Sequence, residues 1–165
     1  MQVAVDQTSV NRRVFGLKET LHEILLTLSP TLRKTTHTVE CHVPRDITLD
    51  SYPGPLGQVI TNLINNALVH AFDGRQTGKI VITATLTQPG WVDIAVRDDG
   101  LGIALTHLDK VFDPFFTTKL GKGGSGLGLN IVYNLVTTTL GGRIQVVSAP
   151  GQGACFTICL PLRAA

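Results

Sequence analysis

Residues 98–129 read DDGLGIALTHLDKVFDPFFTTKLGKGGSGLGL, and this stretch decides how the 165-residue chain folds. It holds seven of the chain's 17 glycines, namely Gly100, Gly102, Gly121, Gly123, Gly124, Gly126 and Gly128. Because glycine frees the backbone, this concentration predicts that the functional site lies here. Positions 98–125 also show no sustained helical or strand period, and such long stretches in compact domains are usually functional. We therefore expect a long lid between two binding edges.

Periodic segments surround this stretch. Apolar residues recur at helical spacing in residues 17–28, 55–72 and 126–140, and Ser29-Pro30 predicts the end of the first helix. Strand-like runs occupy residues 37–43, 79–86, 91–97, 143–148 and 154–160, with a hairpin expected at Gln88-Pro89-Gly90. This order predicts an α+β fold, a two-layer α/β sandwich with a mixed, mostly antiparallel sheet and its helices on one face.

The composition excludes several classes of protein. With 43% hydrophobic and 16% charged residues, the chain is unlike a disordered protein. No apolar run approaches the ~18–20 residues of a membrane helix, and residues 1–14 lack a signal-peptide pattern. The net charge of +2 is too balanced for a nucleic-acid stripe or a membrane-surface patch. We expect neither nucleic acid nor membrane as a direct partner.

The three cysteines, Cys41, Cys155 and Cys159, have no metal-type spacing and indicate reduced thiols. In a strand, Cys155 and Cys159 would have Cα atoms roughly 13 Å apart. A disulfide needs less than about 7 Å, so these two cannot be bridged. We interpret both as small core residues.

Four polar residues recur every fourth position of the predicted helix 55–72: Gln58, Asn62, Asn66 and His70. They form a strip that reaches the edge of the apolar face. A carboxamide at such an edge needs a partner, and its oxygen is an acceptable ligand for Mg²⁺. The alternative interpretation is a set of solvated polar residues with one hydrogen-bonded asparagine.

The sequence Asp98-Asp99-Gly100-Leu101-Gly102-Ile103 follows a predicted strand. Gly100 and Gly102 would let a flat ligand approach the backbone, and the Asp98 carboxylate would accept a hydrogen bond from an exocyclic amine. Because Asp-Gly is a common turn pair, an ordinary turn is the alternative.

Lys122-Gly123-Gly124-Ser125-Gly126-Leu127-Gly128-Leu129 opens a predicted helix. Glycines at a helix start let backbone N–H groups point at an anion. The segment lacks the Gly-Lys-[Ser/Thr] ending of a Walker loop, and no strand leads directly into it. A flexible linker is the alternative, although linkers do not usually alternate glycine with leucine.

Three phenylalanines, Phe112, Phe115 and Phe116, lie between the two glycine-rich motifs. They predict either a small apolar cluster that anchors the loop or a lid docked by aromatic rings. Lys119 would then reach a phosphate as a point charge.

Together and in this order, the motifs resemble the ATP-binding domain shared by type II topoisomerases, heat-shock chaperones, histidine kinases and mismatch-repair ATPases. PFFTTK and GGSGLGL resemble the catalytic domain of two-component sensor histidine kinases, over roughly residues 15–162. The resemblance implies a two-layer sandwich with an ATP lid, and ATP and Mg²⁺ as cofactors. It implies nucleotide contacts from Asn62, Asn66, His70, Asp98, Gly100, Gly102, Ile103, Phe112, Phe115, Phe116, Lys119, Gly124, Ser125, Gly126, Leu127 and Gly128.

The resemblance also implies individual roles. Asn66, with Asn62, would hold Mg²⁺ against the phosphates, and Asp98 would recognise the adenine amine. Asn66 and Lys119 would be the catalytic residues. The implied function is transfer of the γ-phosphate to a histidine on a separate dimerisation domain of the same kinase. A response regulator would be the downstream partner, and the domain would be cytoplasmic.

Three departures from the family pattern qualify this expectation. Gln58 stands where ATP-hydrolysing relatives have a glutamate base, and an amide cannot accept the proton. Val69 stands where many kinases have a lysine, and whether His70 compensates is open. His22-Glu23 is not followed by the proline of the phosphoacceptor motif. We interpret His22 as a surface residue of the first helix.

The expected organisation is a linker remnant of a missing dimerisation domain (1–14), the catalytic domain (15–162) and a tail (163–165). Two alternatives stay open: a serine kinase or ATPase of the same superfamily, and a non-catalytic nucleotide-binding regulatory module.

Overall fold

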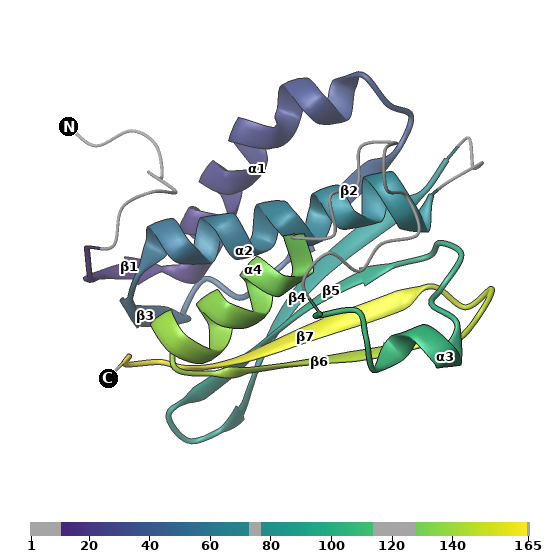
Figure 1. Ribbon diagram of the computed structural model, residues 1–165. Helices are drawn as coiled ribbons and strands as arrows, with labels where there is room; N and C mark the ends of the chain where they lie inside the picture. Colours follow the sequence, from purple (N-terminus) through teal and green to yellow (C-terminus); the bar gives the residue numbers. More distant parts are fainter. Residues whose placement is uncertain (1–10, 73–76, 114–127, 165) are drawn as a thin grey trace.

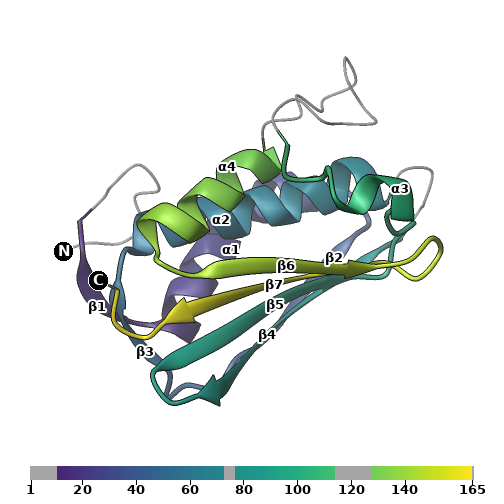
Figure 2. The ribbon, with the colours of Figure 1, turned by 60° about the horizontal axis from the view of Figure 1, so that its bottom comes forward.

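The computed structural model describes residues 11–72, 77–113 and 128–164. Two layers make up the fold, and Figures 1 and 2 show α1, α2 and α4 on one face of a sheet. The helices are α1 (Leu17–Arg33), α2 (Pro53–Asn66), α3 (Leu105–Leu108) and α4 (Gly128–Asn134), with π-helical turns η1 (Ala67–Ala71) and η2 (Leu135–Thr139). The strands are β1 (Arg13–Gly16), β2 (Thr38–His42), β3 (Thr48–Ser51), β4 (Lys79–Gln88), β5 (Trp91–Asp98), β6 (Arg143–Ser148) and β7 (Ala154–Pro161). The predicted α+β sandwich is confirmed.

The main sheet has five strands in the order β2-β4-β5-β7-β6. β2 pairs with β4 in parallel, and the other three pairs are antiparallel. The hairpin predicted around Gln88-Pro89-Gly90 joins β4 to β5. The sheet is therefore mixed and mostly antiparallel, and β5 lies at its centre.

The core lies between the helices and the sheet. On each strand every second side chain points into this layer, as in Ile80 and Ile82 of β4 and Ile94 of β5, all fully buried. Leu56 and Ile60 of α2 are equally buried and belong to the same cluster. The apolar residues repeat every second position in the strands and about every 3.6 positions in the helices, and the two layers are predicted from these two periods.

Helix α1 does not end at Ser29-Pro30 as predicted, but continues to Arg33 with Pro30 inside it. Pro30 cannot donate a hydrogen bond to the carbonyl of Leu26. Both residues are exposed, so water can satisfy that carbonyl and the helix survives the interruption.

The predicted helix 55–72 and the predicted lid 98–125 also differ in detail from the prediction. α2 begins at Pro53, and Ala67–Ala71 forms the π-helical turn η1 instead of a further α-helical turn. Part of the predicted lid has structure of its own, because α3 lies within residues 98–125. Residues 114–125 of that predicted lid lie outside the described ranges.

A second, two-stranded sheet was not predicted. β1 pairs antiparallel with β3, so Arg13 and Val14 of the expected linker belong to a strand. At the other end, Arg163 of the expected tail forms a parallel bridge with Asp50, and the N–H of Ala164 donates to the Asp50 carbonyl over 2.9 Å. Figure 1 shows β1 and the end of β7 on the same side of the molecule.

The three cysteines are free thiols, as expected. The interpretation of Cys155 and Cys159 as core residues is confirmed for Cys155, which is buried, and wrong for Cys159, which is half-buried. The core-facing residues of β7 are Phe156 and Ile158 among others, so the alternate positions of Cys155 and Cys159 face away from the helices. Cys155 is buried there, and Cys159 is half-buried.

In the described ranges, no helix combines the length and the apolar character that crossing a membrane requires.

Candidate functional site

Asp98 ends β5 at the centre of the sheet and is one of three buried polar or charged residues in the described chain. Its Oδ1 accepts hydrogen bonds from the N–H of Gly100 over 2.9 Å and from the N–H of Ala154 over 3.2 Å. Two donors on one oxygen fix the orientation of the carboxylate. A buried, oriented carboxylate at a strand end is suited to accept a hydrogen bond from a ligand amine.

The loop that follows Asp98 is held against the end of η1. The N–H of Leu101 donates to the carbonyl of Ala71 over 2.8 Å. A Cβ at Gly100 would collide with that same carbonyl oxygen, so glycine is needed for the close packing. This contact connects the Asp98 loop to the helix segment that carries the predicted strip of polar residues.

Gly102 has a different reason to be glycine. Its φ is +78°, and a Cβ there would collide with the carbonyl oxygen of Ala149. Packing within the protein therefore requires both Gly100 and Gly102, beside the ligand approach predicted from the sequence.

The polar strip on α2 lies at the boundary between core and solvent. Gln58, Asn62, Asn66 and His70 are all half-buried, as predicted from their spacing. The strip does not keep one α-helical period to its end, because His70 lies in the π-helical turn η1. Regular i, i+4 alignment therefore ends at Asn66.

Asn62 connects α2 to α4. Its Nδ2 lies 3.5 Å from the carbonyl oxygen of Gly128, the first residue of α4. The side chain of Asn66, one turn further along α2, has no hydrogen bond to any described residue. The structure thus brings together Asn62 and Gly128, two residues predicted to face the phosphates.

Phe112 packs on the start of α4. Its ring centroid lies 5.6 Å from that of Tyr133 and 6.2 Å from that of Phe156. Its carbonyl accepts a hydrogen bond of 3.0 Å from Asn130 Nδ2. Phe112 is therefore an apolar anchor, as in one of the two interpretations of this motif.

Seven predicted site residues lie outside the described ranges: Phe115, Phe116, Lys119, Gly124, Ser125, Gly126 and Leu127. Other residues that hold the site together were missed by sequence reasoning, namely Ala71, Asn130, Ser148 and the turn residues 149–153. Each acts through a contact between segments far apart in the chain, which no local pattern signals.

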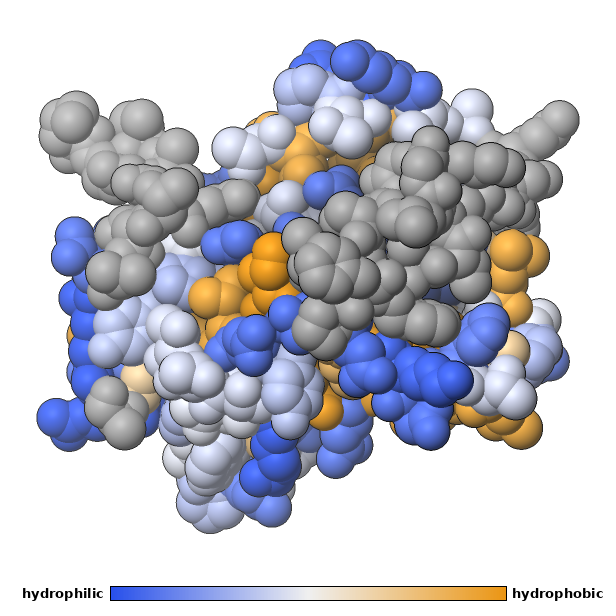
Figure 3. Space-filling model, in the orientation of Figure 1, coloured by the Kyte–Doolittle hydropathy of each residue, from blue (hydrophilic) through white to orange (hydrophobic). Residues whose placement is uncertain are grey.

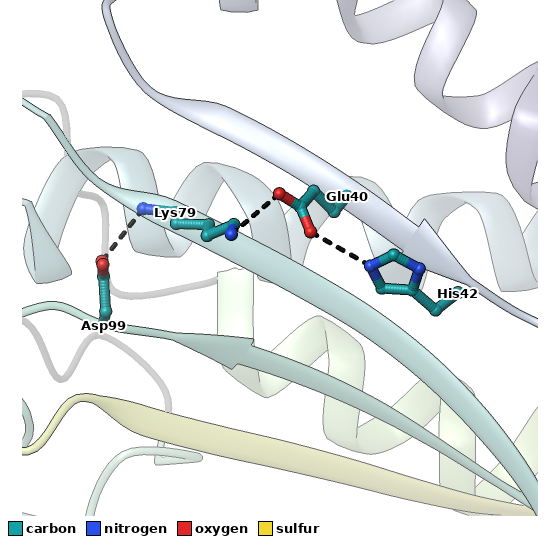
Figure 4. Close-up of polar contacts among 4 residues, drawn as sticks. All are labelled: Glu40, His42, Lys79 and Asp99. Atoms are coloured by element: carbon teal, nitrogen blue, oxygen red, sulfur yellow. Dashed lines mark hydrogen bonds and ion pairs between the residues drawn. The ribbon is translucent and has the colours of Figure 1, made fainter.

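A row of polar contacts runs from the Asp98 loop across β4 to β2 (Figure 4). Glu40 Oε2 lies 2.8 Å from Lys79 Nζ, and Glu40 Oε1 lies 3.0 Å from His42 Nε2. The backbone N–H of Lys79 donates to Asp99 Oδ1 over 2.9 Å. Hydrogen bonding to Lys79, and then to His42, lowers the pKa of Glu40, and Glu40 in turn raises the pKa of Lys79.

On the face in Figure 3, apolar atoms form separate patches among hydrophilic ones. No group of three or more His, Cys, Asp or Glu side chains in the described residues is arranged to hold a metal ion. The side-chain oxygens of Asn62 and Asn66 are acceptable ligands for a hard cation.

Comparison with known proteins gives this geometry a context. Residues 52–164 match the family described as Histidine kinase-, DNA gyrase B-, and HSP90-like ATPase. The chain belongs to this family. Within it, the chain is a catalytic domain of the sensor histidine kinase type.

Two relatives from Escherichia coli strain K12 illustrate the similarity. Sensor histidine kinase ZraS is 46% identical over 110 residues, which cover 67% of this chain and 22% of ZraS. Sensor histidine kinase RcsC is 32% identical over 167 residues, which cover 98% of this chain and 17% of RcsC. The chain thus spans about a fifth of the length of these curated relatives.

Solved structures agree with this assignment. The nucleotide-free catalytic domain of histidine kinase ThkA matches with a TM-score of 0.77 and 27% identity, covering 93% of this chain and 97% of that one. Full-length ShkA in complex with AMPPNP matches with a TM-score of 0.77 and 27% identity, covering 96% and 33%. ThkA in complex with response regulator protein TrrA matches with a TM-score of 0.74 and 26% identity, covering 91% and 41%.

Proposed function

We propose that this domain binds ATP with Mg²⁺ and transfers the γ-phosphate to a histidine on a separate dimerisation domain of the same kinase. One observation carries the proposal. The buried carboxylate of Asp98 accepts hydrogen bonds from the N–H groups of Gly100 and Ala154. The loop after Asp98 is hydrogen-bonded to Ala71, at the end of the helical segment that bears Asn62 and Asn66. A base-recognising carboxylate and two phosphate-side amides thus belong to one connected unit.

Asp98 is the proposed adenine-recognising residue. Its charge makes it a strong acceptor for the exocyclic amine, and its burial removes competing water. Guanine has an oxygen in place of that amine, which a carboxylate repels. AMPPNP, an adenine nucleotide, in the ShkA structure supports this choice of ligand.

Asn62 and Asn66 are the proposed Mg²⁺ ligands. The donor set fits, because amide oxygens suit this cation and the side chain of Asn66 has no hydrogen bond to a described residue. When bound, Mg²⁺ neutralises charge on the phosphates. Asn66 and Lys119 are the proposed catalytic residues, acting through position and charge.

Two further features favour transfer to histidine over hydrolysis or transfer within this chain. Gln58 has an amide in place of a glutamate base, so it cannot activate water by accepting a proton. His22 is exposed on α1 but is not followed by the phosphoacceptor motif. We therefore propose that residues before β1 lead to a separate domain that carries the acceptor.

The downstream partner proposed for the whole kinase is a response regulator, as in the complex of ThkA with TrrA. We place the domain in the cytoplasm, where ATP and that partner are available.

Nucleotide binding is tested with Asp98→Asn. This change keeps the shape and the oxygen that accepts the two N–H groups, but it removes the charge. We expect ATP affinity to fall roughly ten- to a hundredfold in calorimetry. Asp46→Asn, an exposed site in the loop between β2 and β3, should bind like the wild type. Unchanged affinity in Asp98→Asn would overturn the assignment of the base site.

Phosphoryl transfer is tested by mixing the domain with radiolabelled ATP and a histidine-bearing dimerisation domain supplied in trans. We expect an acid-labile label on that partner, with loss of the label in Asn66→Ala. Steady phosphate release by the domain alone would instead favour the ATPase alternative. Tight ATP binding without any transfer would favour the regulatory module.

A further inference from the structure

The turn between β6 and β7, residues 149–153, packs directly on the loop that follows Asp98. Figures 1 and 2 show this turn at the same end of the sheet as α3. The N–H of Gly151 donates to the carbonyl of Leu101 over 2.6 Å. A Cβ at Gly153, whose φ is +73°, would collide with the carbonyl oxygen of Asp98. The turn therefore packs against the backbone of the proposed base site.

Ser148 connects this turn to the loop through one hydroxyl group. Its Oγ donates to the carbonyl of Gly153 over 2.6 Å and accepts from the N–H of Ile103 over 2.8 Å. The hydroxyl thus closes the turn and holds the far end of the Asp98–Ile103 loop at the same time. Both bonds are partly buried, so water replaces them poorly.

The near end of the loop is connected to the same place. Ser148 and Ala154 are opposite one another in the β6–β7 register, and the N–H of Ala154 donates to Asp98 Oδ1. Both ends of the loop, Asp98 and Ile103, are therefore fixed by the residues that frame one turn.

We propose that Ser148 is a positioning residue that sets the selectivity of this domain for adenine over guanine, an inference that rests on the proposed function. Ser148 acts through Ile103 and the turn, and does not itself recognise the base. Discrimination by a carboxylate requires that it be held within a few tenths of an ångström of the base edge. Loss of the hydroxyl leaves the Ile103 N–H without its partner and loosens that geometry.

The test measures ATP and GTP affinities of the wild type and four variants by competition with a fluorescent adenine nucleotide. Ser148→Ala removes both hydrogen bonds, and we expect ATP affinity to fall about tenfold while the weaker GTP affinity changes less. Ser148→Thr keeps the hydroxyl and should therefore have the ATP affinity and the ATP/GTP affinity ratio of the wild type. Ser148→Cys keeps the volume with a weak hydrogen-bonding group and should be intermediate. Ser29→Ala, which removes a hydroxyl that accepts a bond from Arg33 within α1, is the matched control.

The outcomes separate positioning from simple structural support. A narrowed ATP/GTP ratio in Ser148→Ala, restored by threonine, supports the proposal. An unchanged ATP/GTP affinity ratio in Ser148→Ala overturns it, whether both affinities stay the same or both fall by the same factor. If Ser148→Ala fails to fold, the ratio in Ser148→Cys decides in the same way. A wild type that binds no adenine nucleotide overturns the proposed function itself, whereas ATP binding with an unaffected ratio in the variants overturns only this inference.

Discussion

Gly100 and Gly128 of the candidate site differ in the physical reason for which glycine is needed. Gly100 lies against the carbonyl of Ala71, where a Cβ would collide with backbone. Gly128 has no described atom within 4 Å of a Cβ placed on it, and its φ is not among the positive ones. Internal packing therefore explains Gly100, whereas no described atom explains Gly128, for which we propose a close approach by the ligand.

This difference predicts opposite effects of alanine at the two positions. Gly100→Ala should destabilise the domain by about 1–3 kcal/mol, because backbone must move to admit the methyl group. Gly128→Ala should leave the free energy of unfolding unchanged or slightly higher, since alanine favours a helix, but should weaken ATP binding. Urea unfolding and calorimetry measure the two quantities. Equal destabilisation by both variants, or full ATP affinity in Gly128→Ala, would contradict the argument.

At the scale of elements, an ion pair connects the parallel strands β2 and β4. Glu40 on β2 lies between Lys79 on β4 and His42 on its own strand, as Figure 4 shows. Lys79 also bonds Asp99 through its backbone N–H. These side chains lie on the surface, where salt bridges contribute little individually, so their effect is best detected through its pH dependence.

The lowered pKa of Glu40 gives that dependence a sign. A carboxyl whose pKa is lower in the folded state stabilises the fold above its unfolded pKa, and this contribution is lost as pH falls through the folded pKa. Glu40 has a pKa below its ordinary 4.5, mainly through the hydrogen bond to Lys79. Glu40→Gln should therefore be less stable than wild type at pH 7, with a difference that shrinks below about pH 4.

Urea unfolding at several pH values measures this difference. Glu23→Gln on α1 is the matched control, because Glu23 has no ion pair to a described residue. It should show no difference that depends on pH in the same way. A gap between Glu40→Gln and wild type that stays constant down to pH 3 would refute the role of the ion pair.

Elements with a strong local period could be predicted from the sequence, and those formed by pairing could not. α2 and the strands β4 to β7 follow from apolar periodicity, and the polar strip through Asn62 and Asn66 follows from the same projection. β1 and β3 have four residues each, too few to show a period, and depend on pairing with each other. The π-helical turn η1 was missed because an α-helical projection assumes one constant period.

At the scale of the whole molecule, the parts of the site that are contiguous in the sequence were predictable, and those that depend on contacts between distant segments were not. Asp98 and the glycines after it form a contiguous motif, and the chemistry of a carboxylate followed by flexible backbone can be inferred locally. Ser148 lies 45 residues from Ile103, and a serine at a strand end carries no local signal of that bond. The ligand-facing residues thus stay a prediction from the sequence, and the residues that hold their loop in place were missed.

The same global pairing makes the whole first strand part of the domain, although its first two residues, Arg13 and Val14, were predicted to be linker. Phe15 on β1 pairs with Leu49 on β3 and is 7% exposed within the core cluster, while its neighbour Val14 is 65% exposed. Phe15→Ala should therefore destabilise the domain by about 3–5 kcal/mol, a large share of a typical stability. Val14→Ala, on the opposite face of the same strand, should stay within about 0.5 kcal/mol of wild type.

Urea unfolding of the two variants decides where the folded domain begins. A large loss only in Phe15→Ala means that β1 is packed in solution, and that a catalytic fragment must start before Arg13 to retain full stability. Small and equal effects in both variants would mean that β1 is a dispensable extension. The core would then begin at Leu17, which is fully buried at the start of α1.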